Sequence, residues 1–213
     1  MEKREGKVGD LVEKLQKGEL TPKETLKKLE ERGLTEKESW EFIPWVIYFI
    51  LCLLPLMSKQ VKLDFLEFFA QLPAFHFPAI VIYISLVLLA IGTFFIVWQI
   101  HSHRKRGGLK ADETIILYKV GLYRIMRHPG AFGFTMWPIL LPIILSTHVP
   151  FTVLSVAAII IMIIYVYSGC YLEEKLSIKK WGSQYQQYMK EVPRFNFIQG
   201  LWRLRKRSVT RRQ

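Results

Sequence analysis

Two pairs of charged residues border one long uncharged segment of the chain. Arg127 and His128 come directly before residues 129–170, which carry no Asp, Glu, Lys or Arg, and Glu173 and Glu174 follow shortly after. Polar groups beside a membrane segment are costly unless they are satisfied, so they are functional candidates by default. Arginine and histidine bind anions, whereas carboxylates bind cations or accept a proton. The pattern predicts a basic–acidic site, or alternatively a purely structural set of ion pairs that anchors two helices.

Four apolar stretches predict an all-α fold, a polytopic bundle of about four transmembrane helices. They cover residues 42–57, 77–100, 132–145 and 149–169. The second has 24 uncharged residues, and at about 1.5 Å per residue it is roughly 36 Å long, enough to cross a hydrocarbon core. The last two are separated only by residues 146–148, so they predict a tight helical hairpin. The open end of this hairpin would bring the basic pair and the acidic pair together.

The distribution of charge predicts the orientation in the membrane. The net charge is +12, and residues 101–128 and 171–213 hold 18 of the 30 Lys and Arg. Basic loops stay in the cytoplasm, and four spans place both segments on that side. We therefore expect an integral membrane protein whose N- and C-termini are both cytoplasmic. No signal peptide is expected, because the first apolar run begins only near residue 42.

Composition excludes several classes of protein. Half of the residues are hydrophobic and they occur in blocks, which argues against a disordered chain and against an ordinary soluble domain. Cys52 and Cys170 lie inside apolar stretches and predict buried hydrophobes rather than a disulfide framework. We expect no metal site, because His101 and His103 adjoin three basic residues at 104–106 and no carboxylate pair has ligand spacing with them.

The polar N-terminal residues 1–41 predict a short helical head. Thr21 can cap a helix, Pro22 suits its first position, and Glu24 can complete a capping box. Residues 35–38 repeat this pattern. A weak apolar face on these helices predicts a hairpin that docks on the membrane domain or on a second copy of itself.

The chain divides into three predicted parts: the head 1–41, a membrane domain 42–197 and a basic tail 198–213. The Arg203–Arg212 segment is expected to bind anionic lipid headgroups, because a membrane-tethered tail meets lipid before nucleic acid. Trp181, Tyr185 and Tyr188 have the spacing of one face of an amphipathic C-terminal helix, which Gly182 can break.

The order of short motifs over residues 100–197 resembles the isoprenylcysteine carboxyl methyltransferase superfamily, which also includes phospholipid-methyltransferase-like membrane enzymes. The motifs are Gly121-Leu122-Tyr123-Arg124, Arg127-His128-Pro129, an apolar hairpin, Glu173-Glu174, Trp181-Gly182 with Tyr185 and Tyr188, and Val192-Pro193-Arg194. Each piece is weak alone, whereas the ordered combination is specific. The chain departs from the superfamily at Ala131, where a tyrosine is usual.

The resemblance implies an S-adenosylmethionine-dependent methyltransferase. Its acceptor would be an amphiphile that arrives from the bilayer, either a prenylcysteine carboxylate or a lipid headgroup. The resemblance implies catalytic roles for Glu173, Glu174, Arg194 and Arg127. It implies cofactor contacts for His128, Tyr123, Gly121, Pro129, Gly133 and Tyr185. Two alternatives stay open: a sterol-reductase-like enzyme that uses NADPH, and a non-catalytic membrane protein that keeps the fold.

The chemistry of methyl transfer suits these residue types. Displacement at a sulfonium methyl needs mainly alignment and desolvation. A sulfonium cation favours a carboxylate or an aromatic face, which the paired glutamates and Tyr123 could supply. The carboxylate of the methionyl part needs an arginine or histidine donor, such as Arg127 or His128. A carboxylate acceptor needs a cation such as Arg194, whereas an amine acceptor must lose a proton.

Overall fold

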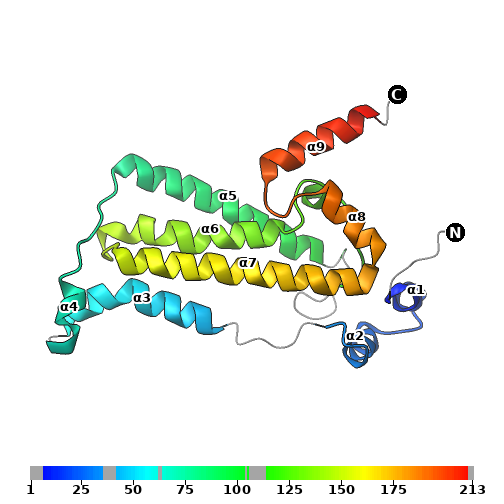
Figure 1. Ribbon diagram of the computed structural model, residues 1–213, viewed down its shortest axis with the longest axis horizontal. Coiled ribbons are helices and arrows are strands. Elements are labelled where there is room, and N and C mark those ends of the chain that lie inside the picture. The colour runs from blue at the N-terminus through cyan, green and yellow to red at the C-terminus, as the bar shows by residue number, and fades with distance from the viewer. Residues whose placement is uncertain (1–6, 36–41, 62–63, 104, 106–113, 211–213) are drawn as a thin grey trace. The chain divides into compact units, whose positions relative to one another are not determined.

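The computed structural model describes residues 7–35, 42–61, 64–103, 105 and 114–210, with side chains up to residue 206 (Figure 1). Over these residues the chain forms helices and connecting turns, with no strand beyond one isolated bridge between Phe75 and Phe151. The all-α prediction is therefore confirmed. The predicted capping pattern at 35–38 extends outside the described residues.

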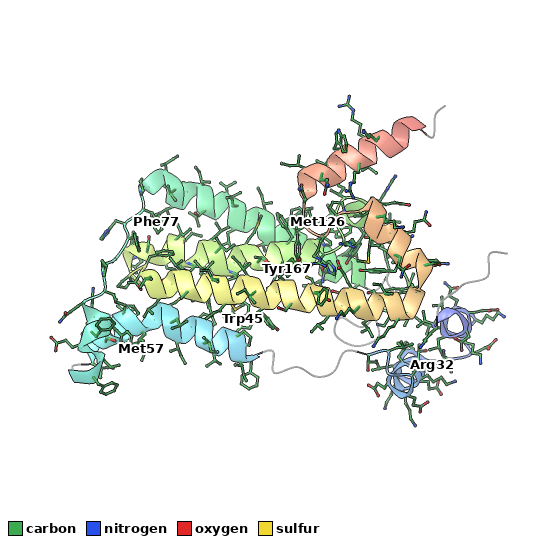
Figure 2. All side chains as sticks on the ribbon, viewed as in Figure 1. Arg32, Trp45, Met57, Phe77, Met126 and Tyr167 are labelled. Carbon is green, nitrogen blue, oxygen red and sulfur yellow. The ribbon has the colours of Figure 1, made fainter. Side chains whose placement is uncertain are left out.

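Four helices are long and apolar enough to cross a membrane, as the sequence predicts. They are α3 (Phe42–Gln60), α5 (Ala79–His103), α6 (Pro129–Ile144), which a short 3-10 turn η4 (Leu145–Thr147) extends, and α7 (Val153–Trp181). Large apolar side chains on α5, among them Tyr83, Val87 and Phe94, are exposed. A helix that is hydrophobic on all sides suits lipid rather than water. Figure 2 shows side chains that project outward all along these helices.

The described chain forms two compact units. The first contains Met1–Lys37, Val97–Pro129 and Cys170–Gln213, and the second contains Glu38–Ile96 and Gly130–Gly169. Every predicted charged site residue therefore falls in the first unit.

The second unit is an apolar helical core. Tyr48 and Cys52 of α3 pack with Ala158 and Met162 of α7, and Phe134 of α6 covers them. The Tyr48 hydroxyl donates a 3.1 Å hydrogen bond to the carbonyl of Pro138. Pro142 has no backbone N–H to donate to the Pro138 carbonyl four residues earlier, so the Tyr48 hydroxyl satisfies a carbonyl that the helix leaves open. A 3-10 turn η1 (Asp64–Leu66) and the short α4 (Glu67–Ala70) follow α3.

The first unit contains the head, α1 (Gly9–Gln16) and α2 (Pro22–Glu31). The predicted capping box is present: Thr21 accepts from the Glu24 backbone, and the Glu24 carboxylate accepts from the Thr21 backbone. The apolar face of the head forms one core with residues that lie far along the chain. This core comprises Val8, Leu11, Val12, Leu29, Leu34, Ile115, Trp181, Tyr185, Tyr188 and Val192. The head thus docks on its own chain.

Two features of the C-terminal part differ from the predictions. Helix α7 continues to Trp181, well past the predicted end of the span at residue 169. Gly182, with φ of 55°, then ends it, and α8 (Ser183–Glu191) starts in a new direction. This left-handed conformation favours glycine, so Gly182 breaks the amphipathic helix, as its position in the sequence indicates. The predicted tail contains a further helix, α9 (Phe197–Thr210).

Candidate functional site

Three hydrogen bonds fasten the segment before the Arg-His-Pro motif onto the end of α7 and onto α8. The Lys180 ammonium donates to the carbonyl of Thr114 over 3.3 Å, and the Trp181 indole N–H donates to that of Ile115 over 3.0 Å. The Tyr188 hydroxyl donates to the carbonyl of Tyr123 over 2.7 Å. All three bonds are buried, so they hold a segment without regular structure in one place.

The turn η3 (Gly121–Arg124) follows this segment and leads directly into the Arg-His-Pro motif. Gly121 has φ of 61°, and the Trp98 ring covers the position where a Cβ would stand. A side chain would therefore meet both backbone strain and a clash. The role of Gly121 in this structure is conformational.

Two backbone hydrogen bonds place the Arg-His-Pro motif beside the Val-Pro-Arg motif. The N–H of Arg127 donates to the carbonyl of Pro193 over 3.0 Å, and the N–H of His128 donates to that of Arg194 over 3.3 Å. Two motifs that are 66 residues apart in sequence thus run side by side. Their charged side chains consequently meet the same residues of α7.

Glu174 is the centre of the charged cluster, and its side chain is only 3% exposed. Its Oε1 atom accepts from Arg194 Nε at 3.0 Å and lies 3.1 Å from both His128 Nε2 and Arg127 Nη2. Its Oε2 atom pairs with Arg194 Nη2. A buried carboxylate is tolerated only when it is paired and hydrogen-bonded. Glu174 meets this condition, because Arg127, His128 and Arg194 all contact its carboxylate.

His128 lies between the two glutamates. Its Nδ1 atom is 3.1 Å from Glu173 Oε2, and its Nε2 atom is 3.1 Å from Glu174 Oε1. A neutral imidazole has one N–H, so only the imidazolium can donate to both carboxylates. Burial lowers the pKa of His128, but the charge of Glu173 and hydrogen bonds to Cys170, Glu173 and Glu174 outweigh burial and hold the pKa well above its usual value. Its two carboxylate partners and its raised pKa both favour the imidazolium form of His128.

Arg127 carries hydrogen-bond donors that the cluster does not use. Its side chain is only 9% exposed, and its Nε and Nη1 atoms have no partner among the described residues. Within the five residues of the cluster, three cations face two carboxylates. One positive charge and two buried N–H groups are thus left for an anion.

A small hollow opens beside these donors. Arg127, Glu173 and Ser177 line it, together with aromatic side chains of Tyr123, Trp181, Tyr185 and Tyr188 and the segment Ile116–Tyr118. Its free space is about 20 Å³, enough for one water-sized group. A carboxylate is larger than this free space, so a ligand end that binds Arg127 here would move the walls of the hollow.

The structure thus brings together most of the predicted site residues. Both predicted tyrosines, Tyr123 and Tyr185, are buried and line the hollow. Pro129 follows His128 and begins α6. Gly133 belongs to the second unit and packs tightly against Gly92 and Phe95 of α5, so its described contacts are those of helix packing.

The sequence did not predict the role of the segment at 114–117 or of the head. Thr114 and Ile115 lack any charge or motif that points to a site. Trp181 and Tyr188 were expected on one helical face with Tyr185, and that spacing is the signal that could have included them. The unpartnered donors of Arg127 follow from packing and have no sequence signal.

The four apolar helices define this chain as a polytopic integral membrane protein, and the cluster gives it a buried polar site. The chain belongs to the family described as "Protein of unknown function (DUF1295)", whose model matches residues 33–192. This family is associated with membrane proteins that resemble steroid reductases and methyltransferases. No curated protein and no solved structure matches the chain. The matched region contains Arg127, His128, Glu173 and Glu174 and ends just before Arg194.

Proposed function

We propose that this protein is a membrane methyltransferase that uses S-adenosylmethionine. The observation that carries the proposal is the pair of buried, unpartnered N–H groups on Arg127, in a cluster that has one cation more than carboxylates. S-adenosylmethionine has a carboxylate that such donors would bind and a sulfonium that prefers aromatic faces and carboxylates. The hollow offers both kinds of group within one site.

The chain's own residues have distinct roles in this proposal. Arg127 binds the carboxylate of the cofactor, and Tyr123, Tyr185 and Glu173 stand where a cation is favoured. Arg194 and His128 hold the Glu174 carboxylate in one orientation. The resemblance assigns Arg194 to the acceptor, but its guanidinium already engages both oxygens of Glu174. We therefore assign Arg194 as a positioning residue for Glu174.

Bound S-adenosylmethionine supplies an electrophilic methyl group, and the protein aligns the acceptor with it and excludes water. A carboxylate acceptor needs no proton transfer, because it is already a nucleophile. An amine acceptor must lose a proton, and the partly exposed Glu173 is the carboxylate with solvent access for that transfer. The exposed apolar helices support an acceptor that resides in the bilayer, a prenylcysteine or a lipid headgroup.

We further propose that both termini are cytoplasmic and that α9 lies on an anionic lipid surface. Ile198, Leu201 and Trp202 are exposed on α9, as are the basic side chains of Arg205 and Lys206. Apolar anchors combined with basic residues are typical of helices that lie in the interface of a membrane.

Calorimetric titration of the detergent-solubilised full chain with S-adenosylhomocysteine tests the proposed function. We expect binding by the wild type and at least a tenfold loss of affinity in Arg127→Met. Arg124→Met removes an exposed arginine of the same segment and serves as the matched control, with unchanged affinity. Absence of binding by the wild type, or equal affinity in Arg127→Met, contradicts the proposal.

The association of the family with steroid reductases makes a second titration informative. NADPH carries phosphates that the free donors of Arg127 could also bind. Binding of NADPH without binding of S-adenosylhomocysteine would favour a reductase, and binding of neither would favour a non-catalytic protein that keeps the fold.

A further inference from the structure

A second and larger hollow lies between the head and residues 115–117. Part of this segment also lines the hollow beside Arg127. The volume of the second hollow is about 190 Å³. From the head it is lined by Val8, Gly9, Val12 and Gln16, and from the rest of the first unit by Ile115–Leu117, Trp181 and Gln184. The hollow exists only because the head is docked there.

The two hollows are neighbours. Ile116, Leu117 and Trp181 line both of them. Two of them, Ile116 and Leu117, follow Ile115, whose carbonyl accepts the 3.0 Å hydrogen bond from the Trp181 indole. A ligand whose end reaches Arg127 in the first hollow thus has the second hollow next to it, across these shared residues.

The lining of the second hollow differs in chemistry from that of the first. Valine and isoleucine side chains and the Trp181 indole supply apolar contact, and no lining residue is charged. Two side-chain amides, Gln16 and Gln184, supply hydrogen-bond donors and acceptors. Such a surface suits a flat, uncharged ring that is apolar on its faces and polar at its edge, as a nucleobase is.

We propose that the head completes the ligand site and that the second hollow binds the adenine ring of the nucleoside. This inference rests on the proposed function, because the carboxylate at Arg127 and the ring under the head would be the two ends of one cofactor. It gives the polar head a binding role that neither its sequence nor the matched family region indicates, since the family match begins only at residue 33. Ligand binding should then stabilise the docked head, because a ligand that binds only the docked state favours that state.

Bulky substitutions at the two amides test the inference. Gln16 is exposed and Gln184 is partly exposed, so Gln16→Trp and Gln184→Trp fill the hollow without disturbing a core position. Lys14→Trp is the matched control, because Lys14 is an exposed residue of the same helix α1 and does not line the hollow. Calorimetric titration of the full-length wild type and variants with S-adenosylhomocysteine gives the affinities. We expect at least a tenfold loss in both glutamine variants and less than a twofold change in the control.

Limited proteolysis with trypsin provides a second readout. The head contains many lysines, and we expect S-adenosylhomocysteine to slow cleavage there in the wild type and in Lys14→Trp but not in Gln16→Trp. If the wild type binds S-adenosylhomocysteine and both glutamine variants bind it equally well, the role of the head is overturned while the proposed function stands. If no protein binds it, the proposed function and this inference are overturned together. If only NADPH binds, protects the head from trypsin and loses affinity in both glutamine variants, the adenine site stands. The assignment of S-adenosylmethionine as the cofactor is then overturned.

Discussion

The first unit contains two arginine–carboxylate pairs of the same type in different surroundings. In the head, Arg32 donates from Nη1 and Nη2 to the two oxygens of Asp10 over 2.8 and 2.6 Å. In the site, Arg194 donates from Nε and Nη2 to the two oxygens of Glu174. The side chains of the head pair are 38% and 50% exposed, whereas those of the site pair are 18% and 3% exposed. The two pairs thus differ in exposure to water, and Glu174 has Arg127 and His128 as further partners.

That difference decides what each pair can do. An exposed pair contributes only about 0–1 kcal/mol to stability, because water solvates both groups almost as well. A buried pair must first offset the desolvation of both groups, and it rarely adds net stability. The head pair therefore stabilises the surface of the head only slightly, and the Arg32 hydrogen bonds lower the pKa of Asp10. The buried cluster is costly to keep, and this cost supports the binding function proposed for it.

Breaking the buried pair should have the largest effect. Glu174→Gln leaves Arg127, His128 and Arg194 around a neutral amide, so three buried cations lose their common carboxylate. We expect a loss of about 3–5 kcal/mol in stability, seen as a lower thermal unfolding midpoint in detergent. Glu173→Gln, at a partly exposed carboxylate, is the control and should lose much less. Equal midpoints for the two variants would contradict this comparison.

The ionisation of His128 should make the stability that the buried cluster contributes depend on pH where this histidine titrates, unlike that of the exposed pair. Because its folded-state pKa is raised, its contribution to stability is fully present below about pH 6.5 and is lost as pH rises through the folded-state value. The charges that face the ring are Glu173, Glu174, Arg127 and Arg194. Wild-type protein should therefore lose stability as the pH rises above about 6.5 and through the folded-state pKa of His128.

The variant His128→Asn isolates this effect. Its unfolding midpoint should be lower than that of the wild type at pH 6.5 and should change less with rising pH. A wild-type profile that is flat over this range, or one that is parallel to the variant's, would show that His128 is not protonated in the folded protein.

A buried hydrogen bond without charge should give an intermediate effect. Tyr188→Phe removes the hydroxyl that donates to the carbonyl of Tyr123 and leaves that carbonyl without this donor. We expect a loss of about 1–2 kcal/mol in the free energy of unfolding. Tyr171→Phe, at an exposed tyrosine, is the matched control and should be neutral. A similar midpoint shift in both variants would mean that the bond is not the cause.

Breaking the exposed pair should have the smallest effect. Asp10→Asn removes the charge that faces Arg32, and we expect a loss of less than about 1 kcal/mol. Because salt screens exposed charges, the loss should shrink further as the salt concentration rises. A large loss of stability that persists in high salt would show that exposure does not determine how much an ion pair contributes to the free energy of unfolding.

The sequence predicted the arrangement of helices more reliably than the details of the site. Apolar length predicts a span directly, and the capping box at Thr21 and Glu24 is a local pattern, so both predictions are confirmed. The predicted hairpin correctly brings the Arg127–His128 pair to Glu173 and Glu174. Its turn was predicted too early, at 146–148, because η4 extends α6 to Thr147 and α7 begins only at Val153. The extension of α7 to Trp181 was not predicted, because hydropathy marks where apolar character ends and not where the helix ends.

By itself, then, the amino-acid order determined four apolar spans, the capped head and the meeting of two charged motifs, since each depends on neighbours along the chain or on one short turn. Tertiary packing alone decided that Arg194 donates hydrogen bonds to Glu174 and that Nε and Nη1 of Arg127 stay unpartnered. It also decided that the head packs against Trp181. These contacts join residues far apart in the chain, and their geometry depends on how close-packed side chains fill the space that they share.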